Sequence, residues 1–108
     1  MTQRKQLLNR RSSETFGFRW RGMGYTATIG CFPDGKLAKI FLSGSNLSTD
    51  GDAIARDAGV VASIALQFGA EVETLRGALL RDSRGAAASP LGAALDRIVD
   101  ASNVGSAS

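Results

Sequence analysis

The sequence contains no histidine and only one cysteine, Cys31, among its 108 residues. Ser/His/Asp and Cys/His nucleophile systems and Cys/His zinc sites need an imidazole or several thiolates, so none of them can be built from this chain. A single thiol also excludes an internal disulfide, and we expect Cys31 to be a small buried residue in a strand of a cytoplasmic protein. No other residues form a catalytic constellation, so we expect a protein that is not an enzyme and has no metal and no cofactor.

Long hydrophobic runs are also missing. No stretch approaches the roughly 20 apolar residues that a membrane-spanning helix needs, and we therefore expect no membrane contact. Hydrophobic residues make up 44% of the chain and charged residues 21%. These fractions are close to the globular average, and a chain of this length can bury one core, so the composition predicts a single folded domain.

The positive charge is concentrated at one end of the chain. The first 21 residues contain one acidic residue, Glu14, and six basic residues, which are Arg4, Lys5, Arg10, Arg11, Arg19 and Arg21. The rest of the chain is net acidic, so the basic character belongs to the N-terminal segment. We expect residues 1–13 to form a flexible basic arm, residues 14–100 to form the domain, and residues 101–108 to be a disordered tail.

Alternating apolar residues predict three antiparallel strands. Residues 15–21 and 25–32 alternate with period two and are joined by a glycine-containing loop at residues 22–24. Residues 33–36 have the sequence Pro-Asp-Gly-Lys, which is a strong turn signal, and residues 37–43 form the third strand.

Three helices follow the strands. The first is expected from Gly51 or Asp52 to Phe68, the second from about residue 72 to Arg81 or Asp82, and the third from Pro90, capped by Ser89. The first helix should be the most buried element and should cross one sheet face. Its expected inward stripe consists of Ile54, Ala58, Val61, Ala65 and Phe68. The predicted fold is thus a two-layer α+β domain, with a three-stranded antiparallel sheet followed by three helices.

The second face of the predicted sheet is both basic and apolar. The residues expected to point inward are Phe16, Phe18, Trp20, Ala27, Ile29, Cys31, Ala38, Ile40 and Leu42. The residues expected to point outward are Arg19, Arg21, Thr26, Thr28, Phe32, Leu37, Lys39 and Phe41. We expect a protein interface on this face to be formed by Thr26, Thr28, Phe32, Leu37, Lys39 and Phe41. The residues that we expect to contact phosphate or nucleic acid are Arg4, Lys5, Arg10, Arg11, Arg19 and Arg21.

Three segments carry a resemblance to a known family. Residues 22–30, 34–42 and 67–75 are similar to the TSCPD domain, a small module that occurs at the C-terminal end of adenosylcobalamin-dependent ribonucleotide reductases and as stand-alone bacterial proteins. The chain departs from the family at its signature motif. No cysteine separates Ser89 from Pro90, and no aspartate follows the proline, so a thiol or metal role at that motif is not carried over.

These observations together predict a non-enzymatic accessory or regulatory module of the TSCPD type. It would act by binding a protein partner or by forming a homodimer, and the resemblance implies a link to ribonucleotide reduction. The alternative is a small nucleic-acid-binding module that uses the basic arm and the outer sheet face.

Overall fold

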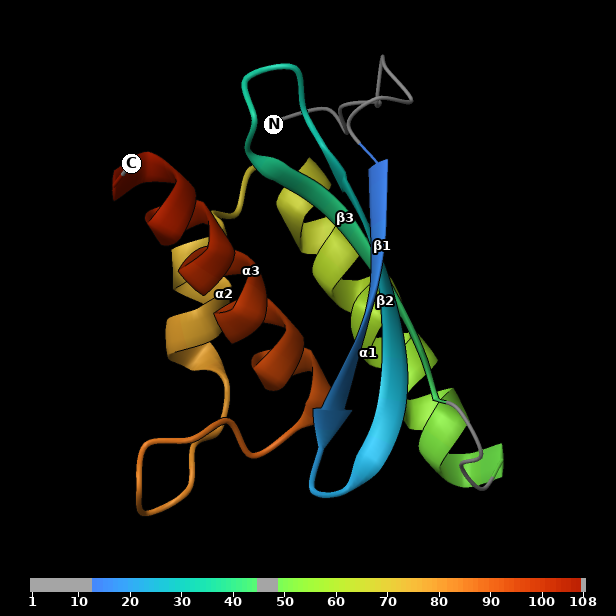
Figure 1. The fold of residues 1–108 in the computed structure, drawn as a ribbon. Helices are drawn as coiled ribbons and strands as arrows, with labels where there is room; N and C mark the ends of the chain where they lie inside the picture. Colours follow the sequence, from blue (N-terminus) through green and yellow to red (C-terminus); the bar gives the residue numbers. More distant parts are fainter. Residues whose placement is uncertain (1–12, 45–48, 108) are drawn as a thin grey trace.

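The structure is a computed structural model that describes residues 13–44 and 49–107. It contains a three-stranded antiparallel sheet followed by three helices, which confirms the predicted α+β fold (Figure 1). The elements are β1 (Ser13–Trp20), β2 (Met23–Cys31), β3 (Leu37–Gly44), α1 (Thr49–Gln67), α2 (Val72–Ala78) and α3 (Pro90–Ala107). Residues 1–12 of the predicted basic arm lie outside the described residues.

The hairpin between β1 and β2 is tighter than the predicted glycine loop. Trp20 pairs directly with Met23, so only Arg21 and Gly22 form the turn. Both have positive φ, at 51° and 80°, which is the backbone of a type I′ turn. Such a turn follows the right-handed twist of the two strands, and for this reason Met23 and the residue after it belong to β2 rather than to the loop.

The turn between β2 and β3 agrees with the Pro-Asp-Gly-Lys signal. The Gly35 amide donates a hydrogen bond to the Phe32 carbonyl at 2.8 Å, and the Asp34 carboxylate accepts one from the Lys36 amide at 2.9 Å. Gly35 has a φ of 90°, a conformation that favours glycine.

A register shift in the β2–β3 pair changes which side chains face the core. Gly30 pairs with Lys39 and Cys31 pairs with Leu37, so Ala38 is an extra residue on β3. Both Leu37 and Ala38 are buried, whereas strict alternation places Leu37 on the outer face. The expectation that Leu37 points outward is therefore wrong, because a bulge interrupts the two-residue period.

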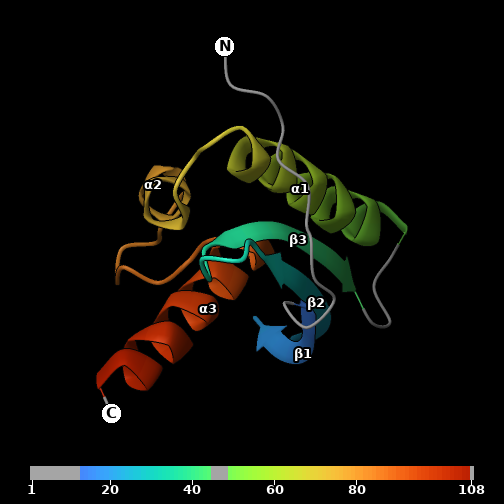
Figure 2. The ribbon, with the colours of Figure 1, turned by 90° about the horizontal axis from the view of Figure 1, so that it is seen from above.

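Helix α1 lies along the edge of β3 rather than across a sheet face (Figure 2). The Ser63 hydroxyl accepts a hydrogen bond from the Ile40 amide and donates one to the Ile40 carbonyl, both at 2.9 Å. The Asp52 carboxylate accepts a hydrogen bond from the Gly44 amide at 3.0 Å. A Cβ atom added at Gly59 would lie 3.0 Å from the Ile40 carbonyl oxygen, so glycine permits this close approach. In this way α1 covers backbone groups of an edge strand.

Helix α3 packs on the inner side of the sheet. The most deeply buried large side chains are Ile40 of β3, Leu66 of α1 and Leu95 of α3, so the core lies where these elements meet. Ser89 caps α3 as predicted, since its hydroxyl accepts a hydrogen bond from the Gly92 amide at 3.2 Å. The helix continues to Ala107, beyond the end near residue 100 that the sequence indicates.

Candidate functional site: an apolar surface and an inner pocket

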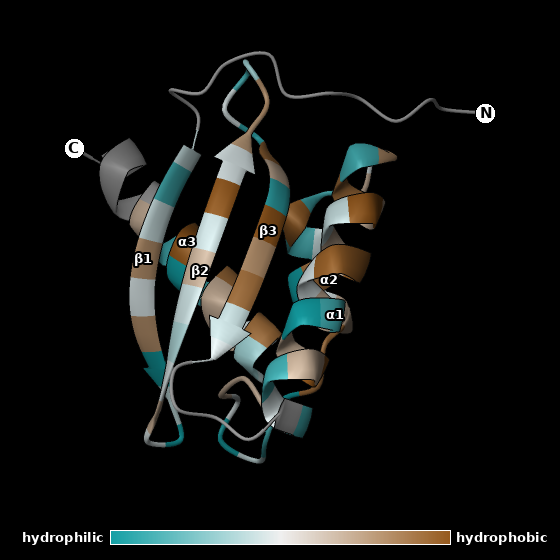
Figure 3. Ribbon diagram, turned by 90° about the vertical axis from the view of Figure 1, so that its right-hand side faces the viewer, coloured by the Kyte–Doolittle hydropathy of each residue, from teal (hydrophilic) through white to brown (hydrophobic). Residues whose placement is uncertain are grey.

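The outer face of the sheet carries most of the predicted interface. Figure 3 shows β1, β2 and β3 side by side with no helix in front of them. Phe41 is exposed, and the Lys39 ammonium lies 5.3 Å from the centre of its ring. Thr28 shares a hydrogen bond of 3.1 Å with Thr15 across the β1–β2 pair. Thr26 lies on the same face, so four of the six predicted interface residues are brought together here.

Two predicted interface residues lie elsewhere. Leu37 belongs to the hydrophobic core. Phe32 lines a pocket on the inner side of the molecule, beside the turn that follows β2. These two residues leave the outer face because of the bulge opposite Cys31 and because regular strand pairing ends at that point.

An exposed apolar surface lies on α1, where the sequence predicted a buried stripe. Ile54 is 70% exposed and Val61 is 67% exposed, while Ala55 and Ala62, one position further along, are buried. The inward stripe is therefore displaced by one residue, and the expectation that α1 is the most buried element is wrong. The outward apolar surface consists of Ile54, Val60, Val61, Ile64 and Phe68. We call these five residues the α1 outer stripe.

A shallow groove joins the α1 outer stripe to the sheet face. Its volume is about 350 Å³, and it is lined by residues of β2, β3 and α1. Phe41 lies on the sheet side, and Val60 and Arg56 lie on the helix side. The exposed apolar area therefore continues from the sheet onto the helix. The small residues at positions 55, 59, 62 and 63 are the sequence signal that could have identified the inward face.

Two of the basic residues predicted to contact phosphate or nucleic acid, Arg19 and Arg21, are described, and both lie at the β1–β2 hairpin. Arg19 is exposed and donates a hydrogen bond to the Gly22 carbonyl at 2.5 Å. The Arg21 guanidinium lies 4.6 Å from the centre of the Trp20 ring, and Trp20 packs against the core. Arg4, Lys5, Arg10 and Arg11 lie outside the described residues.

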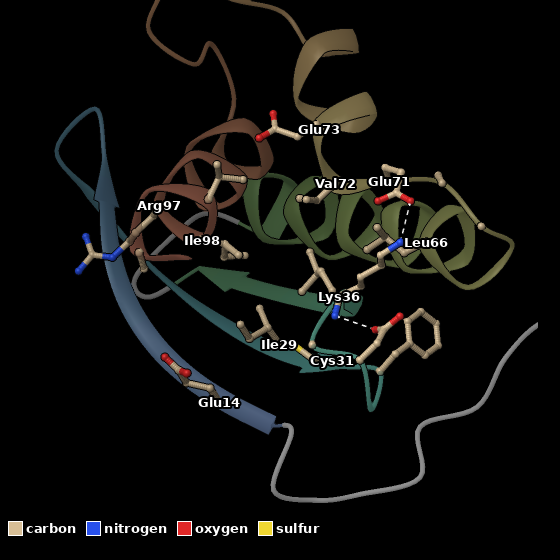
Figure 4. A pocket seen from close by; sticks show the side chains of 18 of the residues that line it. Glu14, Ile29, Cys31, Lys36, Leu66, Glu71, Val72, Glu73, Arg97 and Ile98 are labelled. Atoms are coloured by element: carbon tan, nitrogen blue, oxygen red, sulfur yellow. Dashed lines mark hydrogen bonds and ion pairs between the residues drawn. The ribbon is translucent and has the colours of Figure 1, made fainter. Parts of the chain in front are cut away.

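A larger pocket opens on the inner side of the sheet, at the end where β1 begins (Figure 4). Its volume is about 730 Å³. The apolar lining includes Phe16, Ile29, Leu66, Val72 and Ile98, which come from two strands, from α1, from α2 and from α3. We call this cavity the inner pocket. The inner pocket cannot be recognised in the sequence, because its walls are brought together only by the packing of α3 against the sheet.

Charged side chains line the inner pocket as well. Four carboxylates, from Glu14, Asp34, Glu71 and Glu73, are accompanied by two cationic side chains, from Lys36 and Arg97. The Lys36 ammonium is 3.2 Å from the Glu71 carboxylate (Figure 4). The Arg97 guanidinium lies 5.7 Å from the centre of the Phe16 ring.

Cys31 is half-buried and also lines the inner pocket. Burial raises the pKa of its thiol, and the negative charges of Glu14 and Asp34 raise it further. The thiol is therefore held in its protonated form, which is a poor nucleophile and a poor metal ligand. Among residues 13–44 and 49–107, no group of three or more acidic, cysteine or histidine side chains is arranged to hold a metal ion.

A partly buried ion-pair cluster, centred on Asp96, fixes α2 and the following loop to α3. The Asp96 carboxylate accepts hydrogen bonds from Arg76 at 2.8 Å and from Arg81 at 2.6 and 2.9 Å. These two guanidinium groups lower the pKa of Asp96 to about 2, with Arg81 contributing most. The two arginines come from outside α3, so the cluster joins segments that are distant in the sequence. The cluster is structural, and it supports the wall that α2 contributes to the inner pocket.

No family model matches this chain, and it matches neither a curated protein nor a solved structure. In the described part of the chain, no helix has the length and apolar character needed to cross a membrane.

Proposed function

We propose that this protein is a non-catalytic protein-binding module that pairs with a second copy of itself through the α1 outer stripe. The observation that carries the proposal is the exposure of Ile54 and Val61 at 70% and 67% on a helix whose inner face is already packed. Large apolar side chains that are gathered on one exposed face are typical of interaction surfaces.

The spacing of the stripe favours a second copy as the partner. Ile54, Val61 and Phe68 follow one another at intervals of seven residues, which is the interval of a helix-pairing seam. The seam is also symmetric about Val61. A two-fold axis at Val61 would place Ile54 of one copy beside Phe68 of the other, so that one surface serves both partners.

The charged side chains of α1 do not block such a contact. Arg56 pairs with Asp52 at 2.9 Å, on the side of the helix that faces the sheet. Asp57 is the one acidic side chain that lies within the span of the α1 outer stripe, and it forms no ion pair among the described residues. Phe41 and the groove beside Val60 extend the apolar area at one border of the seam.

The resemblance to the TSCPD domain extends the proposal to an accessory role in ribonucleotide reduction. The dimer would then act on a reductase rather than carry out the reduction. This extension predicts that adding the protein changes the turnover of an adenosylcobalamin-dependent ribonucleotide reductase from the same organism. A turnover that is the same with and without the protein would contradict the extension, while leaving the pairing of copies intact.

Sedimentation equilibrium of the full chain tests the pairing. We expect the mass of a dimer for the natural sequence and of a monomer for the double variant Ile54→Ser/Val61→Ser. Leu80→Ser is a matched control, because Leu80 is an equally large apolar residue, 75% exposed, that lies outside the stripe. A monomer mass for the natural sequence would contradict the proposal. If that monomer also binds DNA or RNA with an affinity that falls as salt is raised, the nucleic-acid alternative is favoured.

A further inference from the structure

The inner pocket has the size and lining of a binding site. Its volume of about 730 Å³ is within the range of ligand pockets, roughly 300–1,000 Å³. Its floor is apolar, and its charged side chains include four carboxylates, two of which are already paired, Glu71 with Lys36 and Glu73 with Arg76. Such a cavity suits an occupant that has both apolar and positively charged groups.

The electrostatics of the pocket favour positive charge. Glu14 and Asp34 form no ion pair among the described residues. Both carboxylates line the pocket, where Arg97 is the one cationic lining side chain that is likewise without an ion pair among the described residues. Residues 69 and 70, which follow α1, line the pocket as well, and the last turn of α1 contains no basic residue that would offset the negative end of its dipole.

One segment of this chain has the matching chemistry. Residues 1–12 contain four basic residues, no acidic residue, and the adjacent pair Leu7 and Leu8. This segment joins β1 at Ser13, and the next residue, Glu14, already lines the pocket. The five residue-to-residue steps from Leu8 to Ser13 span up to about 17 Å when extended, so the leucines can reach a cavity whose border is formed by the first residues of β1.

We propose that residues 1–12 dock into the inner pocket of the same chain, with Leu7 and Leu8 on its apolar floor and the basic side chains at its carboxylates. While it is docked in the pocket, the basic segment cannot bind other partners. This inference concerns a surface different from the α1 outer stripe, so it stands or falls independently of the pairing of copies.

Cys31 provides a direct probe, because it is the only cysteine of the chain and it lines the pocket. The experiment measures the rate at which iodoacetamide alkylates the full chain as a function of pH. The limiting rate at high pH reports access to the sulfur, and the midpoint reports its pKa. The variant Leu7→Ser/Leu8→Ser is compared with the natural sequence, and circular dichroism checks that both are folded.

We expect the double leucine variant to react faster at high pH. If the arm occupies the pocket about 90% of the time, the natural sequence reacts about tenfold more slowly. Leu80→Ser is the control, since Leu80 is 75% exposed and lines neither the inner pocket nor the α1 outer stripe, and it should leave the rate unchanged. Equal limiting rates for the natural sequence and the leucine variant would overturn the proposal.

A charge exchange tests the polar part of the same proposal. Arg10→Glu/Arg11→Glu should raise the limiting rate, and adding Glu14→Arg to that variant should lower it again. An increase that Glu14→Arg does not reverse would overturn the assignment of the basic residues to this pocket. Protection of Cys31 in the natural sequence should be independent of protein concentration. Protection that increases with concentration would place the arm of a second copy there and overturn docking within one chain.

Discussion

The two faces of α1 differ in a way that reverses the usual expectation. The inner face carries small side chains such as Ala55, Gly59 and Ala62, whereas the outer face carries Ile54 and Val61. The inner face lies against the backbone of an edge strand, and a Cβ at position 59 would already be tight against it. Close approach to a backbone thus selects small residues at these positions, and the large apolar residues of α1 other than the buried Leu66 lie on the outer face.

Helix α3 shows the other outcome. Its neighbours are side chains rather than an exposed strand edge, and its inward positions are occupied by Leu91, Leu95 and Val99. In this helix the large apolar residues mark the buried face, as the periodicity predicts. Substitutions on the inner and the outer face of α1 can test this difference between the two faces.

Gly59→Leu should have the largest effect. The new side chain would meet the Ile40 carbonyl and the Leu42 amide, which are backbone groups of β3 that cannot rotate away. We expect the free energy of unfolding to fall by about 3 kcal/mol or more. Chemical denaturation measures it. The matched control is Gly77→Leu in α2, where a Cβ meets nothing within 4 Å, and which should be neutral or slightly stabilising. A similar loss for both variants would show that α1 does not need a glycine for close approach.

Ser63→Ala should have the next largest effect. The substitution removes the hydroxyl that pairs with both the amide and the carbonyl of Ile40 in a buried site. Each unsatisfied group costs about 1–3 kcal/mol, so we expect a loss of about 2–4 kcal/mol in the free energy of unfolding. Hydrogen exchange of the Ile40 amide should become faster in the same variant. An unchanged exchange rate at Ile40 would contradict the role of Ser63 as the cover of this edge.

Asp96→Asn should have a smaller, pH-dependent effect. The pKa of Asp96 is about 2 in the folded protein, against an ordinary value of 3.8. Because the folded value is the lower one, the stabilisation is present above about pH 4 and is lost as the pH falls toward 2. We expect the variant to lose about 1–2 kcal/mol at pH 7, after allowance for partial exposure of the cluster, and to match the natural sequence near pH 2. Asp100→Asn, an exposed charge on the same helix, is the control. A loss that is equally large at both pH values would contradict the ion-pair origin.

Val61→Ser should have the smallest effect on the fold of one copy. Val61 is 67% exposed, so its substitution removes little buried surface. At concentrations low enough to separate any paired copies, we expect a change within about 0.5 kcal/mol in the free energy of unfolding. Thermal denaturation at several protein concentrations measures it, since only the natural sequence should gain stability as the concentration rises. A large loss at low concentration would mean that the α1 outer stripe is part of the core.

Much of the fold can be predicted from local patterns. The alternation of Phe16, Phe18 and Trp20, the turn that contains Gly35 and the cap at Ser89 each depend on residues close in sequence, and all are present in the structure. What failed depends on contacts between distant segments. The bulge that buries Leu37 needs knowledge of the β2–β3 register, and the orientation of α1 needs knowledge of the edge that it covers.

The candidate sites divide in the same way. Thr26, Thr28, Lys39 and Phe41 share a face because alternation on neighbouring strands places them there. The α1 outer stripe and the inner pocket were not predicted. Both arise where α1 and α3 pack against different parts of the sheet, and no single segment contains that information.

The most direct test of the central claim, that the outer face of α1 joins two copies, is an intermolecular NOE experiment. The sample mixes full chains labelled with ¹³C and unlabelled full chains, so that only contacts between copies are observed. We predict intermolecular NOEs at the methyl groups of Ile54, Val61 and Ile64, and none at Ile29 or Ile98 of the inner pocket. The absence of intermolecular NOEs at the three α1 residues, or their appearance only at the pocket, would contradict the account.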